Sequence, residues 1–423
     1  MPPLVKTMAG GGVTRDPDLD PDMHAAYWVV AAGIGAALHI GKLPPALPVL
    51  EKALGISLLQ AGFLLSLVQC AGMLLGLMTG LAVQRVGLKR SMIGGLLLLG
   101  VASALGALAE SAAWLLVTRG LEGLGFLWAV LPGPGLLRQL VPRQRMDRML
   151  GIWGTYMPLG TALALLVGPW VMLTGHGDSG WRLWWCVLSL VAVLFAAAIF
   201  WRLPASPAAE GTLAQTGSAR QSTKALLKLT LSSGPVWLLA LTFGAYAGQW
   251  LSVVGFLPSI YAKAGIASAT AGWLTALAAA LNMVGNVAAG RLLERGVGAF
   301  TLLVTGFAVM GISAMTAFAL PLNPWEQFVA VLVFSMTGGL IPATLFNLGV
   351  QLAPVPEAVS ATVGWMQQWS SAGQFLVPPL VAWIAGRTGG WQWTGWVSMM
   401  FCIAGIALSV HVRRALSRRN GGV

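Results

Sequence analysis

Twelve apolar stretches of about 20 residues follow one another along this chain of 423 residues. Each is long enough to cross the roughly 30 Å hydrocarbon core of a bilayer as one helix. Because exposed backbone groups find no water there, only helices and closed barrels span a bilayer. The chain is 9% charged, against about 25% in soluble domains. The sequence therefore predicts an all-α integral membrane protein with twelve transmembrane helices.

The predicted spans fall into two sets of six. They cover residues 26–50, 58–80, 91–109, 113–138, 148–172, 182–202, 235–258, 269–290, 299–320, 326–350, 357–385 and 391–412. Between the sets, residues 204–234 are polar and rich in Pro and Gly, and predict a linker. Its last part, 224–228, has the pattern of a short basic surface helix or of plain linker. The predicted parts are a tail at 1–25, a bundle at 26–203, the linker at 204–234, a second bundle at 235–412 and a basic tail at 413–423.

The two sets share an internal repeat, because residues 47–85 recur at 257–295 with an offset of 210. The residues identical to those 210 positions later are Leu47, Pro48, Gly55, Ile56, Ala61, Gly62, Leu64, Leu67, Met73, Gly80 and Arg85. Such repeats are typical of secondary transporters, whose substrate site lies between the two units. We therefore expect two pseudo-symmetric six-helix bundles with a site between them.

The net charge of +12 follows the predicted topology. Most lysines and arginines fall on the side of the chain termini. On the other side are Lys52, Arg182, Lys263 and Arg387. Basic residues accumulate on the cytoplasmic side of membrane proteins. We therefore expect a multi-pass protein of a bacterial inner membrane with both termini cytoplasmic, and the charge requires no nucleic-acid partner.

Two motifs resemble those of the major facilitator superfamily. The loop after span two contains Gly80, Gln84, Arg85, Gly87, Lys89 and Arg90 at the spacing of the family's loop motif. Gln84 stands where the family has an aspartate, whereas the repeated loop keeps an acid, in Gly290, Glu294 and Arg295. The resemblance implies that these loops lock the bundles in one state, and that the N-terminal lock is weaker or made by hydrogen bonds.

Span four contains Arg119 and Gly123, which resemble the family's intramembrane Arg-x-x-x-Gly motif and imply proton coupling. Span five meets half of the family's antiporter motif, with Gly151 and Gly160 in place but Ala164 where a glycine is usual. The first span, with its cluster of three prolines between 44 and 48, is similar to the cyanate and nitroimidazole branch of the family.

Charges within the spans are the strongest functional signal. A Lys or Arg at a helix centre costs roughly 2.5–3.5 kcal/mol on insertion scales, so it needs a partner or a water-filled cavity. Lys42 and His39 share one face of span one, and Arg119 and Glu122 share one face of span four. In the family, spans one and four line the central cavity, so the resemblance implies that all four side chains converge.

We expect Lys42, Arg119 and His39 to bind an anion, and Glu122, Arg119 and His39 to couple its transport to protons. Three alternatives remain open. In the first, His39 is merely hydrogen-bonded within an apolar helix. In the others, Lys42 snorkels to the outer interface, or Arg119 and Glu122 form a pair that only positions span four.

The C-terminal half is polar but uncharged. Tyr246, Gln249 and Trp365 are expected to line the substrate pocket, whereas Asn282, Asn286 and Gln374 are expected to join helices. Prolines at 132, 134 and 342 predict breaks in spans four and ten.

The leading functional prediction is a secondary active transporter that moves a small organic anion by alternating access, coupled to protons. The alternatives are proton-linked efflux of a hydrophobic drug and, remotely, a receptor or scaffold. A Gly-rich phosphate loop is missing, so ATP-driven transport is not expected. Cys70, Cys186 and Cys402 are scattered over separate spans and predict no metal site. We expect no enzyme activity, no cofactor, and a monomer whose partners are the solute and the lipid bilayer.

Overall fold

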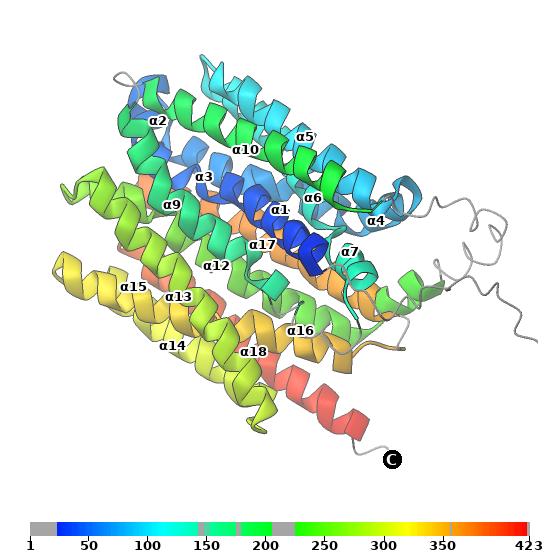
Figure 1. Cartoon of the computed structure of the whole chain (residues 1–423). Helices are drawn as coiled ribbons and strands as arrows, with labels where there is room; N and C mark the ends of the chain where they lie inside the picture. Colours follow the sequence, from blue (N-terminus) through cyan, green and yellow to red (C-terminus); the bar gives the residue numbers. More distant parts are fainter. Residues whose placement is uncertain are drawn as a thin grey trace, which may run out of the picture.

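The computed structural model describes residues 23–142, 149, 152–174, 179–204, 225–355 and 358–420. These segments are helices joined by short turns, and most run along one common direction (Figure 1). The N-terminal bundle contains α1 (Met23–Gly41), η1 (Pro44–Ala46), α2 (Leu47–Leu54), α3 (Leu58–Ser66), η2 (Leu67–Gln69), α4 (Cys70–Val86), α5 (Leu88–Ala107), α6 (Ala112–Val130), α7 (Gly133–Leu140), α9 (Tyr156–Thr174) and α10 (Gly180–Arg202). The C-terminal bundle contains α12 (Gly234–Lys263), α13 (Ser268–Glu294), α14 (Ala299–Ala319), α15 (Pro324–Gly338), α16 (Leu340–Gln351), α17 (Val359–Thr388) and α18 (Trp393–Asn420).

The prediction of an all-helical fold with twelve spans is confirmed. In the described part of the chain, 11 spans are long and apolar enough to cross a membrane. The remaining span is α17, which has 30 residues but a more polar sequence that includes Gln367, Gln368 and Gln374. It packs against α12 on one side and against α3 and α4 on the other. The polar residues of α17 therefore lie on a helix that is packed between neighbouring helices.

Some span boundaries differ from the prediction. Span one continues to Leu54 as the short helix α2, and α18 continues to Asn420 through most of the predicted basic tail. Residues 225–231 are helical, as the basic pattern at 224–228 suggests. The predicted N-terminal tail up to residue 22 and linker residues 205–224 lie outside the described part of the chain.

In the described part of the chain, spans one, two, four and ten each divide into separate helices. Span one breaks between α1 and η1, where Pro44 and Pro45 supply no backbone N–H for a continuous helix. Spans four and ten break before Gly133 and at Gly339, which confirms the breaks predicted from their prolines. In span two, the 3-10 turn η2 separates α3 from α4. Such breaks leave backbone carbonyls without a partner in the helix. In the N-terminal bundle, these carbonyls accept hydrogen bonds from side chains.

The bundles are joined more tightly at one end than at the other. We call the face where α1 begins and α18 ends the terminal face, and the opposite face the distal face. One apolar core runs through the C-terminal bundle and the distal half of the N-terminal bundle. A second core fills the terminal half of the N-terminal bundle. The distal half is thus where a continuous core crosses between the bundles.

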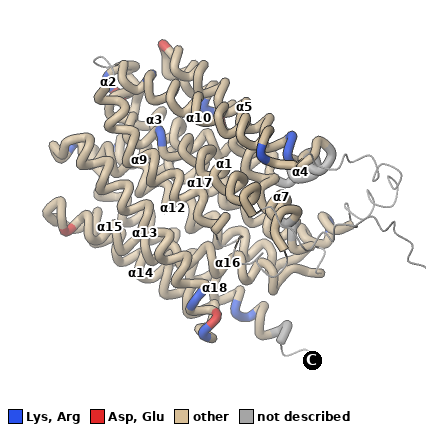
Figure 2. The backbone as a smooth tube through the Cα atoms, in the orientation of Figure 1, with Lys and Arg blue, Asp and Glu red and all other residues tan. Residues whose placement is uncertain are grey.

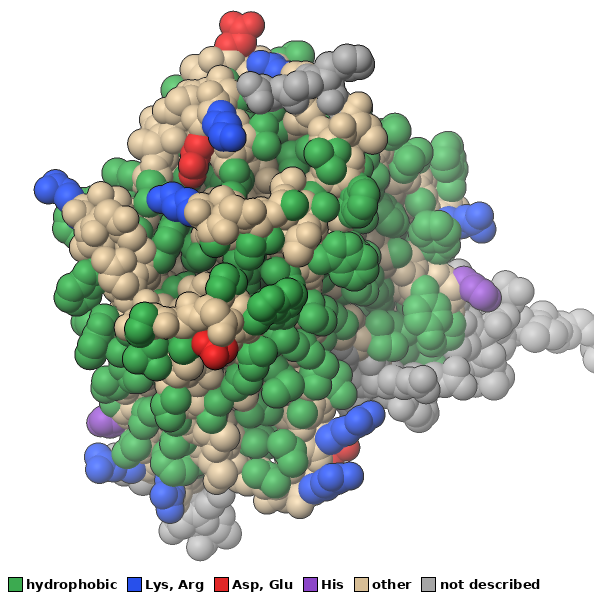
Figure 3. All heavy atoms as spheres, turned by 90° about the vertical axis from the view of Figure 1, so that its left-hand side faces the viewer, with side chains coloured by type: hydrophobic (Ala, Val, Ile, Leu, Met, Phe, Trp, Pro, Cys, Tyr) green, Lys and Arg blue, Asp and Glu red, His purple; other side chains and the backbone are tan. Residues whose placement is uncertain are grey.

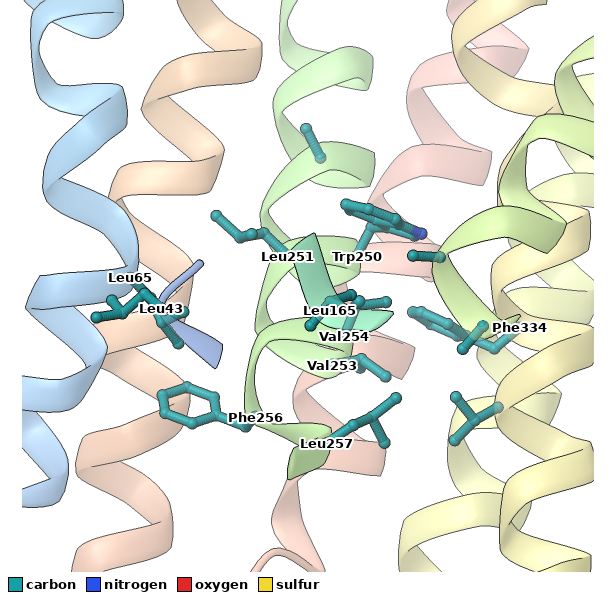
Figure 4. Packing of buried hydrophobic residues seen from close by; sticks show 14 of the residues in the cluster. Leu43, Leu65, Leu165, Trp250, Leu251, Val253, Val254, Phe256, Leu257 and Phe334 are labelled. Carbon is teal, nitrogen blue, oxygen red and sulfur yellow. The ribbon is translucent and has the colours of Figure 1, made fainter. Parts of the chain in front are cut away.

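Helix α12 lies in the middle of the core that joins the two bundles. Leu43 and Leu65 of the N-terminal bundle lie on one side of it and Phe334 of α15 on the other (Figure 4). The distal face itself carries many hydrophobic side chains and few, scattered charges (Figure 3). This arrangement closes the distal side.

Glycines allow the bundles to approach. A methyl group added at Gly62 of α3 would lie 2.9 Å from the Cα atom of Pro379 in α17. At the same seam, the Gln69 amide donates to Gln374 Oε1 at 3.1 Å, and the Ser371 hydroxyl donates to Gln69 Oε1 at 3.3 Å. Gln374 therefore joins helices, as predicted, and does so across the two bundles.

Candidate functional site

Lys42 lies at the break of span one, between the end of α1 and η1. Its Nζ atom pairs with the carboxyl group of Glu122 in α6 and donates to the Ser103 hydroxyl of α5 at 2.9 Å. It also lies 4.4 Å from the centre of the Trp185 ring of α10. The side chain is 0% exposed. The alternative in which Lys42 snorkels to the outer interface is therefore wrong.

Arg119 holds two helix ends together. Its Nη1 donates to the His39 carbonyl at the end of α1, at 2.6 Å, and its Nε donates to the Leu64 carbonyl near the end of α3, at 3.1 Å. The carbonyls at a helix C-terminus carry partial negative charge, which suits a guanidinium group. Nη1 also donates to Glu122 Oε2 at 2.7 Å. The expected pair between Arg119 and Glu122 is thus present.

Two cations therefore share one carboxylate. Glu122 pairs through Oε1 with Lys42 and through Oε2 with Arg119, and it is 1% exposed. The helix break leaves the Lys42 carbonyl free, and Trp184 Nε1 donates a hydrogen bond to it at 3.2 Å. This bond supports the backbone that carries Lys42. We call Lys42, Arg119, Glu122 and His39 the charge cluster.

His39 completes the charge cluster without joining its hydrogen bonds. Both imidazole nitrogens are buried without a regular hydrogen bond, although the Leu188 backbone lies nearby. Arg119 Nη2 is likewise buried without an acceptor. Unpaired buried donors are costly in a folded protein. The charge cluster thus contains donors that a bound ligand would satisfy.

The predicted pocket residues of the C-terminal bundle make their contacts within that bundle. The Tyr246 hydroxyl accepts a hydrogen bond from Asn282, which also donates to the Ser335 carbonyl. Gln249 donates to the Ala245 carbonyl and accepts from the Cys402 thiol. These contacts do not join either residue to the charge cluster.

Trp365 belongs to an aromatic group with Trp237 and Trp369, whose ring centres lie 4.9–6.2 Å apart. Its Nε1 is buried without a partner. A surface hollow of about 580 Å³ lies elsewhere, between α14 and α15, and is lined by Ser313, Trp325 and Glu326 among others. None of the predicted site residues lines it.

The predicted locking loops are only partly described. The side chains of residues 80, 84 and 85 lie outside the described part. Lys89 donates to the Phe200 and Leu203 carbonyls, so it fastens the start of α5 to the end of α10 within its own bundle. In the repeated loop, Glu294 and Arg295 are exposed. Lysines and arginines at helix ends on the terminal face are visible around α5 and α18 (Figure 2).

Several contacts could not be read from the sequence. Ser103, Trp184 and Trp185 surround Lys42, and Gln69 joins the bundles. The only sequence signal for Gln69 is that it is an amide within an apolar span. Ser103 gives a weaker signal, because isolated serines are common in transmembrane helices.

Comparisons with known proteins agree with the fold. The family model of the Major Facilitator Superfamily matches residues 25–367 and again residues 241–423. The chain is 24% identical to the cyanate transport protein CynX of Escherichia coli (strain K12) over 391 residues, which cover 90% of this chain and 94% of that protein. It is 26% identical to the uncharacterized transporter YycB of Bacillus subtilis (strain 168) over 60% of each protein.

Solved structures show the same architecture. A bacterial homologue of the human lysosomal transporter Spinster, in an inward-facing and occupied conformation, has a TM-score of 0.77 at 14% identity and covers 93% of this chain and 97% of that one. A D-xylose-proton symporter has a TM-score of 0.73 at 17% identity and covers 92% and 97%. With the family model matching nearly the whole described chain, the protein belongs to the Major Facilitator Superfamily and is a multi-pass membrane transporter, not an enzyme.

Proposed function

We propose that the protein moves a small anionic organic solute across the membrane by alternating access, coupled to protons. One observation carries this proposal: two buried cations, Lys42 and Arg119, share the single carboxylate of Glu122. With all three groups ionised, one positive charge is left over. An uncompensated charge in a dry interior is strongly unfavourable, so the charge cluster favours an anion.

The helix ends do not remove this surplus. The C-terminus of a helix carries roughly half a negative charge, spread over its last carbonyls. Those carbonyls already accept from Arg119. Among the described residues, the hydrogen-bond partners of Lys42 Nζ are Glu122 and the neutral Ser103. Arg119 Nη2, a buried donor left without an acceptor, would suit an oxygen atom of a small carboxylate or similar anion.

Alternating access is supported by the unequal cores. The bundles share a core in the distal half, so a change of state requires that this seam opens while the terminal side closes. The breaks at Lys42 and at η2 lie next to the charge cluster. Discontinuous helices in transporters supply the substrate site and the points that move.

Proton coupling follows from the same charges. Glu122 and His39 are titratable and lie beside Lys42 and Arg119. An anion that enters changes the field on each group, so the anion and a proton alter each other's affinity. The names of two similar proteins, a cyanate transport protein and a xylose-proton symporter, agree with a small solute and with proton coupling.

Three further properties belong to this proposal. The protein resides in a bacterial inner membrane, with the terminal face towards the cytoplasm, because most basic residues lie on that side. It functions as a monomer. It uses no cofactor, and the proton gradient drives transport.

Competition transport measurements test the function. Purified protein in liposomes is given radiolabelled cyanate or acetate under an inward proton gradient, with protein-free liposomes as the control. We expect uptake that rises with the gradient and is inhibited by small carboxylates. Gradient-driven movement of a lipophilic cation such as tetraphenylphosphonium, with no uptake of either anion, would favour the alternative function of drug efflux. Absence of any transported solute would favour a receptor or scaffold.

A further inference from the structure

Lys42 is the group in the charge cluster whose charge can change without leaving the site unbalanced. We infer that Lys42 carries the coupled proton: its side chain is a neutral amine in the empty transporter and becomes an ammonium ion when the anion binds. This inference rests on the proposed anion transport and assigns the proton to a residue other than Glu122 or His39.

The hydrogen bonds of Lys42 suit both forms. Nζ donates two hydrogen bonds, to Ser103 Oγ and to Glu122 Oε1. The Ser103 hydroxyl itself donates to the Trp185 carbonyl at 3.0 Å, so its oxygen is an acceptor towards Lys42. A neutral amine has two hydrogens and keeps both bonds. An ammonium ion has three, so its additional hydrogen is available for an anion.

Charge balance separates Lys42 from the other candidates. With Lys42 neutral, Arg119 and Glu122 form a balanced pair in the empty site. With Lys42 protonated and a monovalent anion bound, the site is balanced again. Protonation of Glu122 would instead remove the only carboxylate, and protonation of His39 would add a third cation. Arg119 does not release its proton in proteins.

The elements around Lys42 add no other charge. His39 lies on its own helix, and Arg119 and Glu122 lie on α6. The contacts from α5 and α10 come from Ser103, Trp184 and Trp185, which are uncharged. The ring of Trp185 over Nζ keeps water from this side, and such a position still stabilises the ammonium form once it is made.

In the proposed cycle, Lys42 gains one proton and later loses it. One proton from solution adds to the amine of Lys42 as one anion enters, and both leave on the other side. One proton then moves with each anion and no net charge crosses the membrane. Accumulation should therefore follow the pH gradient, about tenfold for each pH unit at equilibrium, and should not respond to membrane voltage.

The test uses the same liposomes with radiolabelled cyanate and acetate. In the wild type, a pH gradient should drive accumulation, whereas a potassium diffusion potential without a pH gradient should not. Lys42→Arg keeps a cation that does not release its proton. We expect it to exchange internal for external anion at a measurable rate but to lose gradient-driven accumulation. Lys52→Arg, the same change at an exposed lysine of α2, is the matched control.

The outcomes are distinct. Gradient-driven accumulation by Lys42→Arg at a rate above that of protein-free liposomes, whose bilayer the neutral acids cross unaided, would overturn the assignment to Lys42. Failure of the wild type to move either anion would instead count against the proposed function itself. If Lys42→Arg does not fold, proton uptake by the wild type decides: addition of cyanate or acetate to the detergent-solubilised protein, followed with a pH-indicator dye, should take up about one proton for each anion bound. Anion binding without proton uptake would overturn the inference.

Discussion

The cores of the two bundles differ although their helices are copies of one plan. At the offset of 210, Lys42 corresponds to Ser252 and His39 to Gln249. At the offset of 212 that relates Gln139 to Gln351, Glu122 corresponds to Phe334. The N-terminal bundle thus buries two ionisable partners, Lys42 and Glu122, and an imidazole where the C-terminal bundle buries a hydroxyl, an aromatic ring and an amide.

The two bundles also differ in whether the corresponding helices are continuous. Helix α12 runs unbroken past Ser252, whose hydroxyl simply donates to the Gly248 carbonyl one turn earlier. Span one breaks at Lys42, and the freed carbonyls accept from Arg119 and Trp184. The buried cation Lys42 is therefore found in the bundle whose first span breaks inside the membrane. The comparison suggests one bundle that performs the charge chemistry and one that provides a neutral frame.

The change with the largest expected effect on this comparison is Glu122→Gln. It leaves Arg119 without its carboxylate inside the bundle. We expect it to lower the free energy of unfolding by about 3–5 kcal/mol and to abolish anion transport. Thermal unfolding of the purified protein measures the first effect. Glu294→Gln, at an exposed site, is the matched control. A variant as stable as the wild type would show that the carboxylate is not required to balance the charge cluster.

Lys42→Met should separate function from stability. It leaves Arg119 and Glu122 as a balanced pair, and replacement of buried charges by apolar groups is often neutral or stabilising. We expect anion transport to be lost while the free energy of unfolding changes by less than about 1 kcal/mol. Lys52→Met serves as the control. Normal transport by Lys42→Met would contradict the proposed role of the charge cluster.

Asn282→Ala probes the neutral frame. It removes the hydrogen bonds to Tyr246 and Ser335, so the free energy of unfolding should fall by about 1–3 kcal/mol. The dependence of transport on the pH gradient should stay as in the wild type. Asn347→Ala, at an exposed position of α16, is the control. If Asn282→Ala uncouples transport from protons, the C-terminal bundle takes part in the charge chemistry.

The smallest effect is expected at the seam between the bundles. Gln374→Leu removes the bond between Gln69 and Gln374, and Gln69→Leu removes this bond and the one from Ser371, each worth about 0.5–1.5 kcal/mol. Each change should shift the transporter towards the state with the distal side open, as measured by spin-label distances across that side. The double variant should shift it little further than Gln69→Leu alone, because Gln69→Leu already breaks both bonds across the seam. Gln327→Leu, whose bond stays within one bundle, is the control and should cause no shift.

The fold was predictable because its signals are strong and local. Apolar length defined most spans, and prolines indicated the breaks in spans four and ten. The charge cluster was also predictable, since Lys42, Arg119 and Glu122 stand out in apolar sequence and their spacing places them on shared helix faces. That these residues lie together in one cluster followed from the family resemblance, which implied that spans one and four meet.

The remaining contacts depend on which helices lie opposite each other. Ser103 and Trp185 are ordinary residues of transmembrane helices until α5 and α10 place them around Lys42. Tyr246 and Gln249 were expected in the pocket because they are polar, but Asn282 and Cys402 satisfy them inside their own bundle. A single sequence does not distinguish these environments, since a hydrogen bond to a neighbour and one to a solute require the same side chains.

The polarity of α17 has a consequence for how the protein is made. During synthesis, a span leaves the insertion machinery according to its own hydrophobicity, before distant helices have packed. Helix α17 is less apolar than the 11 other spans, and it packs between α12 on one side and α3 and α4 on the other, with Gln374 buried. Its stable insertion therefore depends on an N-terminal bundle that is already in the membrane. The seam that opens in the proposed transport cycle is also the surface on which the eleventh span is assembled.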